Sequence, residues 1–197
     1  MALALTQTDA PAEEPVTLLE TKSFMKIRDS MTEADPDISR LIEAARDQYE
    51  QDTRIQLVDA TYTLKLNRFP AGPGTIELPR PPLSSVTSIQ YVDENGTTQT
   101  LSALLYQTDT DRWPGRVVPD ADEITWPLTK IGEINAVTIT FVAGYGEASD
   151  VPERHKREIK MMVLYMFDHP DAATEKRMHV DPIYDMRTTS ERVASFG

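Results

Sequence analysis

Apolar residues recur at helical spacing in the segment 36–52. The spacing follows the 3.6-residue period of an amphipathic helix. Asp35 precedes the segment as a plausible N-cap, and Pro36 suits the first helical position. The pattern therefore predicts a helix over about 36–52, with charged side chains on its other face. The apolar positions are Ile38, Leu41, Ile42, Ala45 and Tyr49.

The same period predicts a longer helix near the end of the chain, over about 152–168 and beginning at a proline. Such a helix is roughly 25 Å long. Its methionines either fill an irregular core or form an adaptable contact between subunits, and the two roles are compatible. Its expected core or ring-building face consists of Ile159, Met162, Val163, Met166 and Phe167.

A third, shorter helix is expected over about 17–26. Thr17 and Glu20 have the spacing of a capping box, in which each side chain binds the other's backbone N–H.

Between the predicted helices, apolar residues recur at every second position. Tyr62, Leu64 and Leu66 alternate with polar residues, as in a half-buried strand. The prolines of TIELPRPPL suit an edge strand. Asn95-Gly96 between β-rich flanks predicts a tight hairpin with a primed turn. A β-rich unit over about 57–145, with helices before and after it, indicates an α+β fold in which an antiparallel unit is inserted into a helical body.

The two ends lack such patterns. Residues 1–15 are small, acidic and proline-containing, and we expect a flexible arm there. Residues 172–197 are polar with scattered apolar positions. This tail is expected to be disordered or to be ordered by a partner.

The last predicted strand ends in the turn Gly144, Tyr145 and Gly146. Glycine reaches backbone conformations that are closed to other residues, and the tyrosine between the two glycines can anchor the turn to the core. We expect this turn to redirect the chain into the final helix.

Composition narrows the function. The 197 residues include no cysteine, which excludes disulfides, thiolate metal sites and thiol nucleophiles. The formal net charge of −12 argues against a broad nucleic-acid-binding surface. It is compatible with a surface past which DNA slides. No run of about 18 apolar residues predicts a membrane span, and the first residues do not resemble a signal peptide. We therefore expect synthesis and assembly in the cytoplasm.

No catalytic, cofactor or metal site is predicted. Nucleophile-elbow, P-loop and dinucleotide-binding motifs are absent from the sequence. The aspartates of TDTDRWPG begin like an EF-hand loop, but Pro114 replaces the required glycine and Asp120 the required glutamate. The histidines lack metal-ligand spacing, and His155 and His169 are expected at the surface. A chance pair of carboxylates remains possible, and it would make a carbohydrate-acting enzyme one alternative.

Four stretches of the sequence resemble parts of the head-tail connector, or adaptor, proteins of tailed bacteriophages, and they follow one another in the same order as in that family. The paired N-terminal helices of that family resemble PVTLLETKSFMKI and ISRLIEAARDQYEQDT. Its proline-led strand and hairpin resemble LPRPPLSSVTSIQYVDENGTTQTL, and its last strand, turn and helix resemble VTITFVAGYGEASDVPERHKREIKMMVLYMFDH. The resemblance covers most of residues 15–170 and implies a connector domain over 16–171.

The resemblance implies a structural, non-enzymatic role. About a dozen copies would form a ring beneath the portal at the head-tail junction of a virion. The ring would extend the DNA channel without sequence-specific binding, and would support the next connector, stopper or tail protein. The C-terminal segment would reach the portal, with contacts expected from Ile183, Tyr184, Arg187, Arg192 and Phe196.

Three alternatives remain at this stage. A stopper or tail-completion protein would more often be a small β-barrel, without flanking helices. An enzyme with paired carboxylates would need two close acids and at least one raised pKa. A monomeric β-sandwich binding module would leave the terminal helices and the tail without a purpose.

Overall fold

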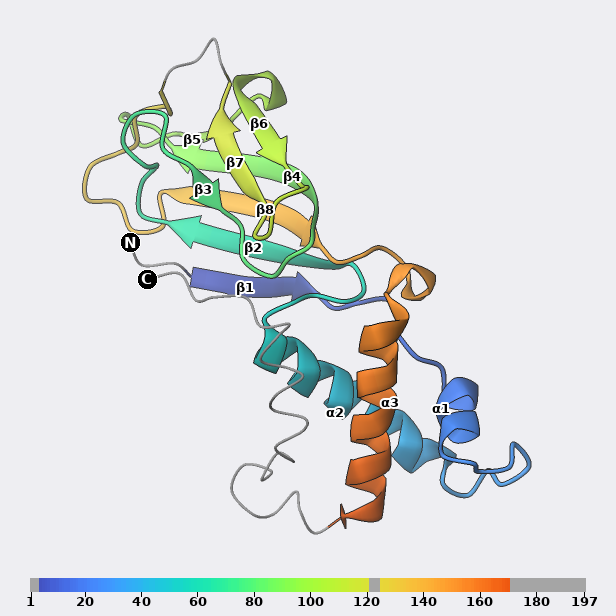
Figure 1. The fold of residues 1–197 in the computed structure, drawn as a ribbon. Coiled ribbons are helices and arrows are strands. Elements are labelled where there is room, and N and C mark those ends of the chain that lie inside the picture. The colour runs from blue at the N-terminus through green and yellow to red at the C-terminus, as the bar shows by residue number, and fades with distance from the viewer. Residues whose placement is uncertain (1–3, 121–124, 171–197) are drawn as a thin grey trace. The chain divides into compact units, whose positions relative to one another are not determined.

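The computed structural model describes residues 4–120 and 125–170, and the chain forms two compact units. The β unit comprises Met1–Ala12 and Asp59–Tyr145, and the helical unit comprises Glu13–Val58 and Gly146–Gly197. The chain therefore passes between the units after Ala12, after Val58 and after Tyr145. Figure 1 shows the elements of each unit. Helices and antiparallel sheets occupy separate parts of the sequence, which confirms the α+β class.

The described strands of the β unit form two antiparallel sheets. The five-stranded sheet has the order β1-β2-β8-β4-β5, and the three-stranded sheet has the order β3-β7-β6. The proline-flanked strand β3 lies at a sheet edge, as the sequence predicts. The strands are β1 (Ala4–Asp9), β2 (Ala60–Leu66), β3 (Ile76–Glu77), β4 (Leu83–Val92), β5 (Thr98–Thr100), β6 (Tyr106–Asp109), β7 (Arg116–Pro119) and β8 (Val137–Ala143), with a 3-10 turn, η1, at Ala103–Leu105.

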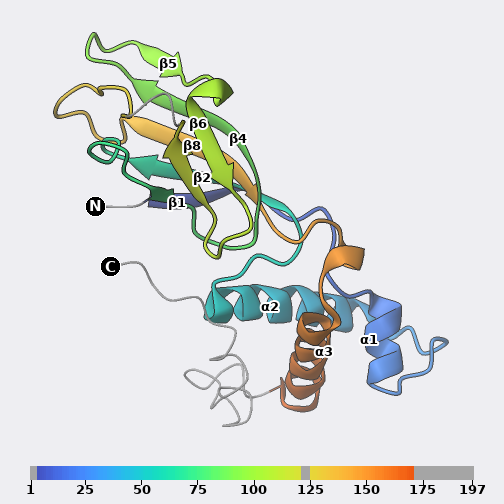
Figure 2. The ribbon, with the colours of Figure 1, turned by 45° about the horizontal axis from the view of Figure 1, so that its top comes forward.

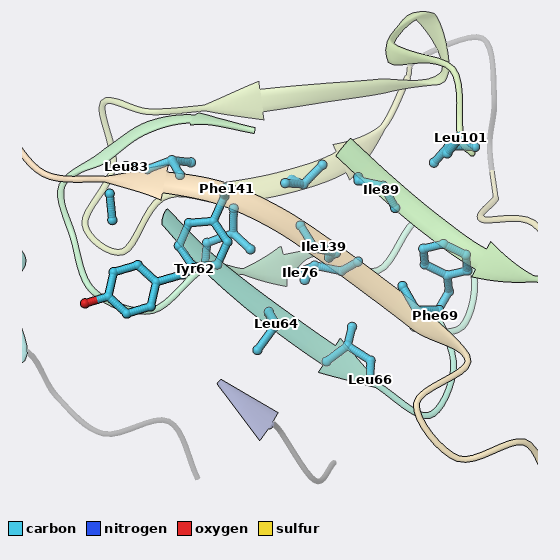
Figure 3. Close-up of a cluster of buried hydrophobic side chains, with 14 of the residues drawn as sticks. Tyr62, Leu64, Leu66, Phe69, Ile76, Leu83, Ile89, Leu101, Ile139 and Phe141 are labelled. Carbon is cyan, nitrogen blue, oxygen red and sulfur yellow. The ribbon is translucent and has the colours of Figure 1, made fainter. Parts of the chain in front are cut away.

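One apolar cluster holds the two sheets of the β unit together. Alternate residues of β2 and β8 are buried, as expected for strands with one face on a core. Tyr62 and Phe141 stack with ring centroids 5.8 Å apart, and both sheets contribute side chains to the cluster (Figure 3). Phe69 also stacks on Trp126, with centroids 4.9 Å apart. The alternation predicted at residues 62, 64 and 66 is confirmed.

The described part of the helical unit contains α1 (Leu18–Phe24), α2 (Asp35–Thr53) and α3 (Glu153–Asp168), with a 3-10 turn, η2 (Ala148–Asp150), before α3. Thr17 caps α1, and the predicted capping box with Glu20 is present. Figure 2 shows α3 crossing α2 at a steep angle, with α1 beside them. The core of this unit is formed mainly by Ile38, Ile42, Ala45, Tyr49, Ile55, Leu57, Ile159, Met162 and Val163.

The predicted flexible arm over residues 1–15 is wrong for Ala4–Asp9. These residues form β1, which pairs antiparallel with β2 from Ala4 opposite Lys65 to Asp9 opposite Thr61. The polar composition misled the prediction, because an edge strand gains its stability from backbone hydrogen bonds and needs little apolar surface.

Two local predictions also need correction. The hairpin between β4 and β5 exists, but Gly96 alone of the Asn95-Gly96 pair has positive φ (83°), so the turn is not type I′. The side chain of Asp93 shapes the turn by accepting the N–H groups of Asn95 and Thr97, each at 2.9 Å. At α2, Ala34 is the N-cap and Asp35 is the first helical residue.

Candidate assembly surfaces

The structure divides the predicted face of α3 between core and surface. Ile159, Met162 and Val163 are buried, Met166 is half-buried, and Phe167 is 36% exposed. The second half of α3 therefore turns part of its apolar face toward solvent. Met161, the remaining methionine of this helix, is 38% exposed. The methionines of α3 therefore contribute to the core at Met162 and to the surface at Met161.

His155 is fully buried in the helical unit, which corrects its expected surface position. Its Nδ1 lies 2.8 Å from the Tyr49 hydroxyl, and Arg154 Nε lies 3.2 Å from its Nε2. Because a guanidinium only donates, Nε2 is the acceptor and Nδ1–H donates to Tyr49. Burial, and secondarily the charge of Arg154, lower the pKa of His155 to about 4. This imidazole is a neutral core group that connects α2 to α3.

The helical period contained a signal for the buried histidine. His155 precedes Ile159 by four residues and Met162 by seven, which is the spacing of the buried face of α3. Its position beside the proline at the helix start suggested a surface residue instead.

Lys22 is a second buried polar group that the sequence did not reveal. Its Nζ donates to the carbonyls of Asp29 and Met31 at 3.1 and 2.8 Å, and lies 2.6 Å from Asp35 Oδ1. The ammonium group thus uses three donors to tie the loop between α1 and α2 to the first turn of α2. No periodicity in the sequence predicts this contact, because its partners lie in an irregular loop.

Arg46 and Glu50 of α2 form a charge network with the segments before α1 and after α2. Arg46 Nε donates to Glu14 at 2.8 Å, and Arg46 NH1 donates to the buried Glu50 at 3.1 Å. Glu50 also accepts the Leu57 N–H at 3.0 Å. Charge-assisted bonds of this kind are stronger than neutral ones and hold these linker residues on the helical body.

The Gly-Tyr-Gly turn needs both glycines. Gly144 has φ 144°, and a Cβ there would lie 2.5 Å from the backbone nitrogen of Asp59. Gly146 has φ 118°, and a Cβ there would lie 2.6 Å from a carboxylate oxygen of Asp150. Tyr145 is half-buried, with its ring 6.1 Å from that of Trp113. Close backbone approach and positive φ explain the motif without any binding role.

Exposed apolar side chains occur in both units. In the β unit, Ile131 is 97% exposed and lies in the loop before β8. In the helical unit, the ring of Phe24 lies 6.0 Å below Lys160 Nζ. Single exposed apolar residues are normal, but several on one helix favour a protein contact. Besides Phe24, the exposed apolar side chains of the helical unit include Leu19, Met31, Met161, Tyr165 and Phe167.

The EF-hand-like stretch uses one of its acids in an ion pair. Asp109 of the EF-hand-like stretch forms an ion pair with Arg116 at 2.9 Å. Within residues 4–120 and 125–170, no group of three or more His, Asp or Glu side chains is placed to hold a metal ion. In the same ranges no helix is long and apolar enough to cross a membrane. The predicted portal-binding residues Ile183, Tyr184, Arg187, Arg192 and Phe196 lie outside the described residues.

Comparison with solved structures finds chains that share this fold. The chain resembles a protein in the neck of an empty gene transfer agent (GTA) particle with C6 symmetry, with TM-score 0.77 and 18% identity over 98% of this chain and 97% of that one. Chains from the neck of the native particle with C12 symmetry and from the native virion match with TM-score 0.75 at the same identity and coverage. The sequence matches no protein-family model and no curated protein. At this identity the likeness establishes a shared fold.

Proposed function

We propose that this chain is a structural subunit of the head-tail neck of a tailed, phage-like particle. In this role its copies form a ring between the portal and the next connector, stopper or tail protein. The observation that carries the proposal is the structural likeness to neck proteins over 98% of this chain and 97% of theirs. The match therefore extends over nearly all of both sequences and is not confined to one shared module.

A ring of twelve copies agrees with the C6 and C12 symmetry of the similar necks. Ring closure requires heterologous contacts, in which two different faces of each subunit meet. The net charge of −12 favours a channel along which DNA passes, since few phosphate counterions would be released on contact. Assembly would take place in the host cytoplasm, and the mature location would be the virion neck.

This role requires no catalysis. An enzyme with paired carboxylates needs a carboxyl group whose pKa is raised. The pKa of Glu20 is lowered, first by the hydrogen bond from the Thr17 backbone N–H, and the pKa of Asp93 is lowered by the Thr97 backbone N–H. The hydrogen bonds behind these two shifts stabilise the start of α1 and the turn between β4 and β5, so Glu20 and Asp93 have a structural use.

Electron microscopy of the chain mixed with the portal protein from the same genome tests the proposal. We expect a ring stacked coaxially on the portal. Protein that is folded but never associates with the portal or with itself would overturn the proposal. Association with the distal end of a preformed neck, and none with the portal, would instead favour a stopper or tail-completion protein.

The tail at 172–197 is proposed to supply the portal contact through Ile183, Tyr184, Arg187, Arg192 and Phe196. Deletion of this tail should abolish portal binding and leave the thermal midpoint of the remaining protein unchanged. A control with the tail replaced by a Gly/Ser segment of equal length separates lost contacts from lost length. Normal portal binding by either variant would contradict this assignment.

A further inference from the structure

The outer stripe of α3 combines cations with exposed apolar side chains. It is formed by Arg154, Arg157, Met161 and Tyr165, which share one helix face opposite the buried residues. Met161 and Tyr165 are 38% and 37% exposed. The arginines lie in the first two turns, where the positive end of the helix dipole disfavours cations. Arg154 also donates through Nε to His155. Acidic groups of another molecule would add to the partners of the two arginines.

The outer stripe of α2 contains two acids and one cation. Its cation, Arg40, is exposed and pairs with Asp37 at 3.4 Å within the same helix. Glu43, Ala44 and Asp47 are exposed on the face away from the core. Glu43 and Asp47 lie four residues apart in the middle of α2, and Asp47 also accepts a hydrogen bond from Gln51 Nε2 at 2.7 Å. Ala44 is small and leaves room for a larger side chain beside it. This stripe would gain from a basic partner with a protruding apolar residue.

The two stripes face away from each other within the helical unit. The buried faces of α2 and α3 meet through Tyr49 and His155. Figure 2 shows the two helices crossing. The outer stripe of each helix is therefore turned away from the other helix. A heterologous ring needs this arrangement, because each subunit must present two different and complementary surfaces.

We propose that the outer stripe of α3 in one copy packs against the outer stripe of α2 in the next copy around the ring. Arg154 and Arg157 face Glu43 and Asp47 of the neighbour, and Met161 packs beside its Ala44. Complementary charge fixes the direction in which subunits add, and the flexible methionine fills the space at the small residue. This inference rests on the proposed ring and names its lateral contact.

Because the chain lacks cysteine, engineered thiols can test the contact directly. The double variant A44C/M161C is assembled on the portal and oxidised. We expect a ladder of covalent multimers, since each subunit carries one thiol for each neighbour. The single variants A44C and M161C should give no ladder, and an equal mixture of them should give covalent dimers. A44C/L104C, with the same number of thiols but one outside the stripes, is the matched control.

Charge reversal provides a second readout. R157E should reduce ring formation at least tenfold at equal protein concentration, and adding D47R to the same chain should restore it; Arg154 is left unchanged because it also donates to the buried His155. Rings that form without a specific A44C/M161C ladder would overturn this contact and leave the proposed function intact. A wild-type chain that never forms rings with the portal would overturn the proposed function and, with it, this inference.

Discussion

At the scale of single residues, environment determines what each polar side chain does. His155 is buried between α2 and α3, where its two ring nitrogens have Tyr49 and Arg154 as partners. A charged imidazole would lose its hydration there, so burial keeps it neutral. The same residue type at a surface would be a candidate for proton transfer, whereas here it connects two helices.

The titration of His155 should make stability depend on pH. Its pKa is about 4 in the folded chain against an ordinary 6.5, so the unfolded chain binds more protons between these values and stability falls as pH is lowered through this window. From pH 7 to pH 5 the loss should be about 2 kcal/mol. Urea unfolding at a series of pH values measures it. H155Q should lack this loss and H169Q should retain it, and equal pH dependence in all three proteins would contradict the assignment.

Gly144 should tolerate substitution poorly. G144A combines positive φ with a Cβ placed 2.5 Å from the Asp59 nitrogen, and should cost more than about 2 kcal/mol of unfolding free energy. Gly132 also has positive φ, but a Cβ there meets nothing within 4 Å. G132A should therefore cost only about 1 kcal/mol. Chemical denaturation of both variants separates backbone strain from collision, and equal losses would show that the collision is relieved.

At the scale of elements, buried charges hold irregular segments to regular ones. Lys22, near the end of α1, donates hydrogen bonds to two loop carbonyls and to the Asp35 carboxylate at the start of α2. Arg46 and Glu50 perform the same task for the segments before α1 and after α2. These contacts provide order where the chain has few apolar residues to bury.

Replacing Lys22 should loosen the connection between α1 and α2. K22M removes a buried cation and leaves its acceptors without that partner. The expected loss of unfolding free energy is about 2–3 kcal/mol. This is less than for a fully buried ion pair, because Asp35 is partly exposed. R40M removes a pair of similar type that is exposed, Arg40–Asp37, and should cost less than about 0.5 kcal/mol. Thermal unfolding compares the two. Similar losses would mean that the Lys22 contacts contribute little.

At the scale of the whole molecule, the net charge determines which kinds of partner the chain repels. The net charge of −12 repels phosphates, and the basic stretch at the start of α3 is short. A chain of this net charge attracts few anionic partners over its surface as a whole, as the proposed neck function requires.

Duplex DNA should therefore not bind the isolated chain. At about 0.15 M salt, proteins that bind DNA non-specifically have dissociation constants of roughly 10⁻⁴–10⁻⁶ M. We expect no measurable binding of the duplex by this chain in that concentration range. Fluorescence anisotropy of a labelled duplex tests this. Salt-sensitive binding in the micromolar range would show that local basic residues outweigh the net charge.

The sequence by itself determined the secondary structure that depends on local periodicity. The helical spacing of Ile38 to Tyr49, the alternation of Tyr62 to Leu66 and the capping box at Thr17 each report one element, and each is present in the structure. Repeating apolar positions leave such signals because one face of each element must be buried. The α+β class follows from their order along the chain.

Tertiary structure alone decided the features that join distant residues. Backbone pairing with β2 turned the polar segment Ala4–Asp9 into a strand, and partners from other segments buried His155 and Lys22. The outward stripes of α2 and α3 became distinct surfaces only when their inner faces met. The strand at Ala4–Asp9 and the burial of Lys22 leave no local period in the sequence, and for His155 the helical period marks the buried face but not the partners, because residues remote in the sequence supply them.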